Sequence, residues 1–202
     1  MKPFAESCEQ NKQVILDVIK PVLMDADHVL EIGSGTGQHA VFFAAAMPHL
    51  FWYPSDRQEA IAGIQMWLDE YYAHPQTPDN IVPPIELDVM QGHWPNIEVD
   101  AVFTANTLHI MHWQAVQQLF ARVPSVLNEQ GDMLIYGPFN YNGQYTSDSN
   151  RQFDQWLKNR DPQSGIRDLD ELQKLAEQHN LYLKDDYPMP ANNRILHWKK
   201  HI

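Results

Sequence analysis

Three glycines at alternate positions, Gly33, Gly35 and Gly37, directly follow a short apolar segment. That segment, residues 28–32 (HVLEI), has the length and apolar character of a buried strand, and residues 38–47 after the glycines are typical of a buried helix. Glycine permits positive φ and leaves backbone N–H groups accessible to a ligand. A strand, a tight glycine loop and a helix in this order indicate an α/β fold with a nucleotide-like ligand at the carboxyl end of the strand.

The alternation of strand and helix continues through the first two thirds of the chain. Apolar residues at helical spacing predict helices over residues 6–24, 57–73 and 113–127, and Pro124 should bend or end the last of these early. Short apolar runs predict strands over residues 50–53, 85–89, 101–105 and 133–136. Such alternation implies parallel strands joined by right-handed crossovers, and hence a doubly wound α/β fold.

The last third of the chain departs from this pattern. Residues 137–168 are polar, with one short helical patch at 153–157, and we expect them to form an insertion over the active face. A helix over 169–179 and two terminal strands, 181–184 and 195–199, complete the chain. At 202 residues the length suits one core, so we expect a single domain over residues 1–202.

The charge balance limits what the chain binds. There are 14 Lys and Arg residues against 26 Asp and Glu, whereas contacts to nucleic-acid phosphates need a clustered basic surface. The same acidity opposes binding to anionic membranes, and no apolar run approaches the roughly 18 residues of a spanning helix. The stretch MKPFAESCEQNK lacks the apolar centre of a secretory signal. We therefore expect a cytoplasmic protein whose partner is a small molecule, with no nucleic acid and no membrane.

The spacing of the glycines separates the possible ligands. A dinucleotide fingerprint counted from Gly33 needs a glycine at position 38, where the chain has Gln38, and no Gly-Lys-Ser/Thr follows as in a P-loop. An NAD-dependent oxidoreductase is therefore an alternative that rests on fold analogy alone. The spacing that fits is acid-x-Gly-x-Gly-x-Gly, beginning at Glu31.

With this motif the chain resembles the class I S-adenosylmethionine-dependent methyltransferases. The resemblance implies a Rossmann-like, mostly parallel seven-stranded sheet with an antiparallel terminal strand, and S-adenosylmethionine as the cofactor. The loop under the methionine part of the cofactor would comprise Glu31, Gly33, Ser34, Gly35 and Gly37. The other implied contacts are Asp56 on the ribose hydroxyls, Asp88 and the Val89 backbone near the adenine, and Asn106 facing the methionine ammonium.

Each acid in this set also has a plainer interpretation. Glu31 can be a capping carboxylate beside the loop. Asp56 immediately precedes a helical pattern, as an N-cap residue would, and Asp88 can be a turn residue after a strand. The motif, its place between strand and helix, and the two further acids together favour cofactor binding.

A narrower resemblance covers nearly the whole chain. The segments EIGSGTGQHAVFFA, YPSD, IYGPFNYNGQYTSDSNRQFD, DPQSGIRD and PANNR are similar to a methyltransferase-like family described only as domain of unknown function 938. The substrate of that family is not established, so the reaction is inferred from the site.

Candidate groups for the chemistry follow the fourth and fifth strands. His109 is the best-placed general base for an oxygen or amine acceptor, although a lone histidine there is more often structural. His112 lies three residues on, but no acid or cysteine completes a ligand set, so no metal is expected. Polar side chains that can orient an acceptor are Asn140, Tyr145, Arg151 and Arg167. Their alternative is a solvated loop in which the arginines pair with Asp154 or Asp168.

Together these features predict an enzyme that transfers a methyl group from S-adenosylmethionine to an oxygen or nitrogen of a small molecule. No Asn/Asp-Pro-Pro-aromatic sequence follows the fourth strand, where ANTLH stands, which disfavours methylation of base amino groups. Because no base is clear, a catalytically silent S-adenosylmethionine-binding or scaffolding protein is the alternative.

Overall fold

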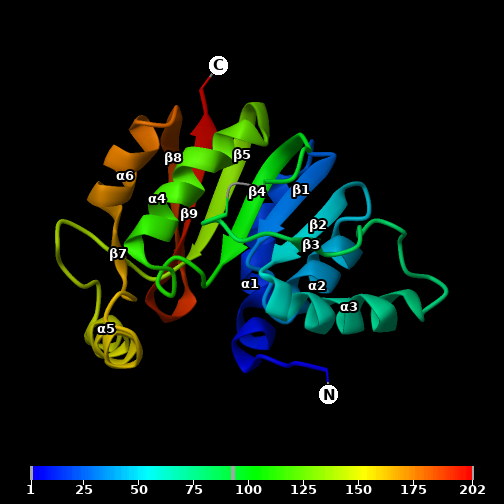
Figure 1. Cartoon of the computed structure of the whole chain (residues 1–202), viewed down its shortest axis with the longest axis horizontal. Coiled ribbons are helices and arrows are strands. Elements are labelled where there is room, and N and C mark those ends of the chain that lie inside the picture. Colours follow the sequence, from blue (N-terminus) through cyan, green and yellow to red (C-terminus); the bar gives the residue numbers. More distant parts are fainter. Residues whose placement is uncertain (1, 92–93, 202) are drawn as a thin grey trace.

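The computed structural model describes residues 2–91 and 94–201, and this part of the chain forms one seven-stranded sheet of order β3-β2-β1-β4-β5-β9-β8 (Figure 1). Its strands are β1 (His28–Ile32), β2 (Phe51–Asp56), β3 (Ile85–Glu86), β4 (Val99–Ala105), β5 (Leu127–Gly137), β8 (Leu181–Met189) and β9 (Asn193–Lys200). Strand β9 is antiparallel to both β5 and β8, and the other pairs are parallel. The predicted doubly wound sheet with one antiparallel terminal strand is confirmed.

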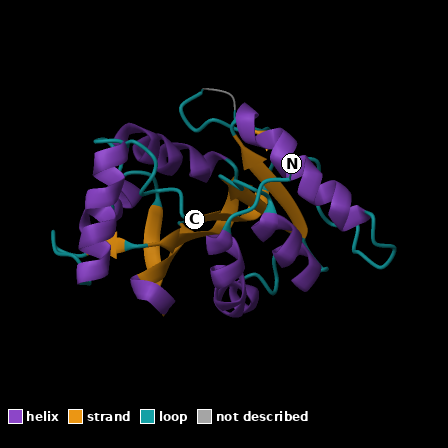
Figure 2. Cartoon of the chain, turned by 90° about the horizontal axis from the view of Figure 1, so that it is seen from below, coloured by secondary structure: helices purple, strands orange, loops and turns teal. Residues whose placement is uncertain are grey.

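Helices cover both faces of the sheet (Figure 2). One face packs against α1 (Glu6–Val22), α2 (Gln38–Ala46) and α3 (Gln58–Tyr72), and the other against α4 (Trp113–Arg122) and α6 (Leu169–Glu177). The successive residues Val102 and Phe103 of β4 point into different core clusters, and both are fully buried. Within the described residues, no helix combines the length and the apolar character needed to cross a membrane.

Strand β2 runs through Pro54, where the sequence predicted its end. The N–H and C=O of Trp52 bond to residues 80–82 on one side, and Pro54, two residues on, directs its nitrogen to that same side. Pairing with β3 resumes only after Pro54, so the missing N–H falls in a gap of the ladder. The proline is therefore tolerated inside the strand.

The segment 137–168 contains a helix much longer than the predicted patch at 153–157. Helix α5 spans Asp148–Arg160, and β6 (Phe139–Asn140) pairs with β7 (Arg167–Asp168) on either side of it. The helix is anchored by a buried carboxylate instead of an apolar stripe, which is why its periodicity is weak. Asp154 Oδ2 accepts from the Tyr145 hydroxyl and from Lys158 Nζ, each at 2.6 Å, and Oδ1 accepts from the Ile166 N–H at 2.8 Å.

One buried side chain ties the loop before β3 to the end of helix α2. Asn80 Nδ2 donates to the carbonyl oxygens of Ala44, Met47 and Leu50 at 2.9, 3.3 and 3.0 Å. Its Oδ1 accepts from the Tyr71 hydroxyl at 3.1 Å. Because the last carbonyls of a helix have no partner within it, Asn80 serves as a cap supplied from a distant part of the chain.

Replacing Asn80 with Ala should lower the free energy of unfolding by about 2–4 kcal/mol, because buried carbonyls lose their donor and a small void forms. Urea denaturation followed by circular dichroism measures this change. Gln76→Ala, at an exposed position of the same loop, should change the free energy by less than about 0.5 kcal/mol. Equal effects of the two substitutions would contradict the capping role.

Candidate functional site

The glycine loop is seated on the end of strand β2. The N–H groups of Gly33 and Ser34 both donate to the Ser55 carbonyl at 2.9 Å, and all three glycines have positive φ. A Cβ on Gly33 would lie 2.6 Å from the Thr107 side chain, so only glycine fits there. A Cβ on Gly35, in contrast, would meet no atom within 4 Å. The loop thus packs tightly at its start and faces open space at Gly35.

That open space is a cavity of about 700 Å³ at the carboxyl ends of β1, β2 and β4. The predicted cofactor residues in its wall are Gly33, Ser34, Gly35, Asp56, Asp88, Val89 and Asn106. Two more predicted residues, Glu31 and Gly37, lie behind the loop and do not line it. The start of α1 contributes Ser7 and Cys8, which the sequence did not point to. A cavity of this size and position suits a small-molecule ligand.

Glu31 is a buried carboxyl group that supports the loop from behind. Its side chain accepts hydrogen bonds from Ser34 Oγ and Trp52 Nε1, both at 2.9 Å, and the residue is 1% exposed. Burial raises the pKa of Glu31 to about 7, and the two hydrogen bonds oppose this shift because they stabilise the ionised form. The nearby charge of Asp56 adds to the increase in pKa.

Asp56 connects the loop to the start of helix α3. Its Oδ2 accepts from the Gly35 N–H and its Oδ1 from the Arg57 N–H, both at 2.7 Å. Arg57 is the N-cap of α3 and no side chain bonds at that cap, so the interpretation of Asp56 as an N-cap is wrong. A carboxylate has about four acceptor positions, which leaves room for further donors from the cavity.

Two other predicted residues hold turns at the cavity wall. Asp88 Oδ1 accepts from the Met90 N–H at 2.9 Å, so its plainer interpretation as a turn residue is confirmed, although it also lines the cavity. Asn106 has a φ of 59°, in the left-handed region that asparagine tolerates better than most residues, and its N–H donates to the Tyr136 carbonyl.

The structure does not bring His109 to the cavity. The residue is 6% exposed, and its ring lies edge-on to Phe153 at 5.3 Å between centroids. Burial and the charge of Arg167 lower its pKa to about 4, which makes it a weak base. The prediction that His109 is the best-placed base is therefore wrong, because the chain turns after β4 and carries His112 into the wall instead.

The four predicted acceptor residues also lie outside the cavity wall. Tyr145 is bound to Asp154, and Arg151 pairs with Asp148 at 2.8 Å instead of with Asp154 or Asp168. The Arg167 guanidinium donates to backbone carbonyls, among them those of Leu108 and Met111. Within the described residues, the buried Asn140 Oδ1 has no hydrogen-bond partner. The arginines serve the structure of the insertion, which the sequence could not distinguish from a ligand site.

One residue of the insertion does reach the cavity. Asp161, at the C-terminal end of α5, lines the wall and accepts a hydrogen bond from His112 Nε2 at 2.9 Å. Asp161 begins the DPQSGIRD segment, but the sequence predicted no role for Asp161 in the site. His112 and Asp161 are 49 positions apart in the sequence, so no local sequence pattern predicts their hydrogen bond.

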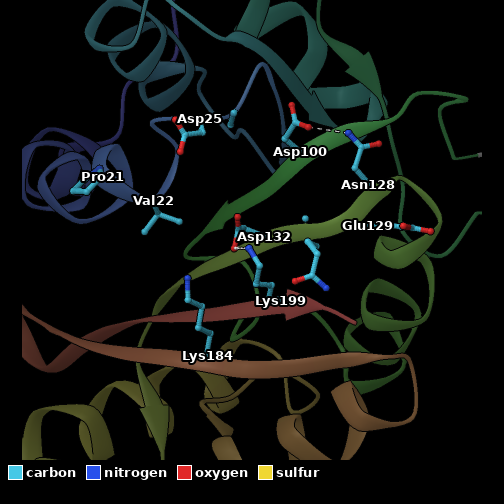
Figure 3. A pocket seen from close by; sticks show the side chains of 12 residues that line it. Pro21, Val22, Asp25, Asp100, Asn128, Glu129, Asp132, Lys184 and Lys199 are labelled. Carbon is cyan, nitrogen blue, oxygen red and sulfur yellow. Dashed lines mark hydrogen bonds and ion pairs between the residues drawn. The ribbon is translucent and has the colours of Figure 1, made fainter. Parts of the chain in front are cut away.

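A second cavity of about 460 Å³ lies at the opposite edge of the sheet (Figure 3). Two of its carboxylates are already engaged by other side chains: Asp132 binds Lys199 at 3.1 Å, and Asp100 accepts from Asn128 at 2.8 Å. The amino ends of parallel strands are also not where open α/β sheets bind ligands. Across residues 2–91 and 94–201, no three His, Cys, Asp or Glu side chains are grouped to hold a metal ion. We therefore assign the candidate site to the larger cavity.

The strand order, the glycine loop and the cavity define a class I methyltransferase-like fold. The chain matches the model of the family DUF938, described as "Protein of unknown function", over residues 2–200. The chain therefore belongs to the DUF938 family, and the resemblance found in the sequence is confirmed.

Three solved structures illustrate the similarity of fold. The mitomycin 7-O-methyltransferase MmcR has a TM-score of 0.75 at 18% identity, with 88% of this chain and 50% of that chain covered. Human N-acetylserotonin methyltransferase in complex with S-adenosylmethionine has a TM-score of 0.78 at 16% identity, with 98% and 53% covered. An O-methyltransferase family protein from Burkholderia thailandensis has a TM-score of 0.81 at 12% identity, with 97% and 58% covered. The chain thus spans about half the length of these proteins.

The raised pKa of Glu31 predicts a pH dependence of stability. Its pKa in the folded protein, about 7, lies above the ordinary value of 4.5, so the folded state holds a proton that the unfolded chain releases. This stabilising contribution is present below about pH 4.5 and is lost as the pH rises through about 7. The loss is on the order of 3 kcal/mol.

Glu31→Gln, which resembles the protonated form, should remove this part of the pH dependence and be more stable than the unsubstituted protein at about pH 8. Urea denaturation at several pH values measures it. Glu129→Gln, at an exposed carboxylate, should leave the dependence intact. An unchanged pH dependence in Glu31→Gln would show that Glu31 is ionised in the folded state.

Proposed function

We propose that the chain binds S-adenosylmethionine in the larger cavity and transfers its methyl group to a small-molecule acceptor. The observation that carries this proposal is the cavity wall itself, where Gly35, Asp56 and Asn106 meet at the ends of three strands. In this arrangement the glycine loop lies against the methionine part, Asp56 accepts the ribose hydroxyls, and Asp88 lies near the adenine. The solved methyltransferases of similar fold support the same assignment.

The charge of the wall favours a cationic ligand over a nicotinamide dinucleotide. Three carboxylates line the cavity, Asp56, Asp88 and Asp161, and Arg57 is engaged by Glu59 at 2.9 Å. A sulfonium and an ammonium are attracted by this net negative charge, whereas a pyrophosphate is repelled. The negative charge of the cavity wall thus argues against an NAD-dependent oxidoreductase. The presence of Gln38 where a dinucleotide fingerprint has its third glycine argues against it as well.

Methyl transfer from a sulfonium is an in-line displacement, so the protein must align the acceptor with the breaking bond and exclude water. We place the acceptor beside Asp161, the residue through which the segment 137–168 contributes to the wall. The segment then acts as an insertion over the active face of a single domain. The absence of His109 from the cavity wall favours the alternative of a catalytically silent S-adenosylmethionine-binding protein. Binding of the cofactor without methyl transfer would support that alternative.

Gly35→Ala tests where the ligand binds. Its Cβ points into the cavity, so we expect S-adenosylmethionine to bind at least tenfold more weakly, as measured by isothermal titration calorimetry. Gly143→Ala is a matched control, because Gly143 also has positive φ, +70° against +58°, and also meets no atom within 4 Å. Each substitution adds a similar backbone strain of about 1–2 kcal/mol, but Gly143 does not line the cavity.

Thermal unfolding gives a second readout of the same proposal. S-adenosylmethionine at about 100 times its Kd should stabilise the unsubstituted protein and Gly143→Ala by about 2.7 kcal/mol, and NADH should stabilise neither. If S-adenosylmethionine fails to raise the melting temperature of the unsubstituted protein, the cofactor proposal is wrong. If both alanine variants bind it equally well, the ligand lies elsewhere.

A further inference from the structure

We infer that His112, held by Asp161, is the general base for a hydroxyl acceptor, so that the reaction is O-methylation of a phenol or alcohol. This inference rests on the proposed function and adds the acceptor class and the proton acceptor. Its basis is that His112 and Asp161 both line the cavity and are hydrogen-bonded to each other at 2.9 Å.

The hydrogen bond fixes which nitrogen of His112 can take a proton. A carboxylate only accepts, so His112 Nε2 carries the hydrogen that Asp161 Oδ2 receives, and Nδ1 carries the lone pair. Asp161 is itself held, because its Oδ1 accepts from the Gln163 N–H at 2.9 Å. These hydrogen bonds lower the pKa of Asp161 and keep it ionised.

The other titratable side chains of the cavity are poor bases. Burial lowers the pKa of His39 to about 4, and its Nε2 is bonded to Asn11 at 2.7 Å. Burial raises the pKa of Cys8 to about 11, so the thiol stays protonated near neutral pH. The carboxylates Asp56 and Asp88 accept backbone N–H groups. His112 is therefore the best available base among these groups.

The surroundings of His112 set the shape and charge that an acceptor meets. Ile110, Met111 and Ala115 line the same part of the wall and offer an apolar surface to the body of an acceptor. The charged groups closest in the hydrogen-bond network are Asp161, which is bonded to His112, and Arg167, which is bonded to the Met111 carbonyl. An apolar body with one hydroxyl group matches this wall better than an anion does.

The step is a single displacement. The acceptor oxygen forms a bond to the methyl carbon, the carbon–sulfur bond breaks, and its electron pair remains on sulfur to give the neutral thioether. The hydroxyl proton passes to His112 Nδ1, and the resulting imidazolium is stabilised by Asp161. An amine acceptor can lose its proton after the transfer, but an un-ionised phenol or alcohol is a weak nucleophile and benefits from a base.

The acidity of the acceptor distinguishes a His112 that acts as general base from a His112–Asp161 pair with only a structural role. The full chain is assayed with methyl-labelled S-adenosylmethionine against phenols of graded acidity, from 4-methylphenol to 4-nitrophenol, with anilines as a second arm. His112→Gln should lower kcat/KM about 10²- to 10⁴-fold for 4-methylphenol. The loss should be less than about tenfold for 4-nitrophenol at about pH 8, where that acceptor is already ionised.

Asp161→Asn should act through the tautomer of His112. An amide nitrogen opposite Nε2 donates, which moves the imidazole hydrogen to Nδ1 and removes the lone pair, so kcat/KM should fall and its pH profile should change. Asp148→Asn is the matched control, because Asp148 lies on the same helix in an exposed pair with Arg151. It should alter neither the rate nor the pH profile. The His112–Asp161 pair is itself about half exposed and contributes little to stability, so these variants should fold.

Calorimetry of S-adenosylmethionine binding distinguishes a failure of the proposed function from a failure of the O-methylation inference alone. If the unsubstituted protein does not bind the cofactor, the proposed function itself is wrong. If it binds the cofactor but methylates no hydroxyl of the panel, or only the anilines, the O-methylation inference is overturned. An equal loss in His112→Gln for acidic and weakly acidic phenols would likewise overturn the role as base.

Discussion

The fold depends on the hydrogen bonds that Ser55 makes where strand β2 meets the glycine loop. Its carbonyl accepts the N–H groups of Gly33 and Ser34, its N–H donates to Ser34 Oγ at 3.1 Å, and its hydroxyl donates to the Glu31 carbonyl at 2.6 Å. Ser55 is fully buried, so each of these bonds would be costly to leave unmade. They fix the loop relative to β2 and thereby place Asp56, the next residue, at the cavity.

The sequence predicted most of what local interactions determine. The strand, loop and helix around Gly33 were expected in the right order, because apolar runs, glycines and prolines act over a few residues. The errors lie where distant contacts decide. Strand β2 passes through Pro54 because its pairing with β3 begins only after that residue. The length of α5 was underestimated because a buried Asp154 replaces an apolar contact.

The candidate site also has one part that the sequence predicts and another that it does not. The cofactor residues follow strands, and the carboxyl ends of parallel strands meet at one edge of a sheet, so their neighbourhood follows from the alternation alone. The acceptor side is built by the turn after β4 and by the end of α5, whose meeting depends on tertiary packing. Along that turn, His112 in the wall lies only three positions after the buried His109. At identities of 12–18%, the similarity to the solved structures shows the fold alone.

The position of β9 has a consequence for the order in which the sheet can assemble. This strand follows β8 in the sequence yet lies between β5 and β8, and it pairs with both along most of its length. During synthesis, β1 to β5 can therefore pair before β8 has any neighbour in the sheet, and β5 presents an open edge until β9 is made. Such late closure by a distant strand slows folding and exposes an edge to other chains. The half of the sheet that carries the cavity is complete first.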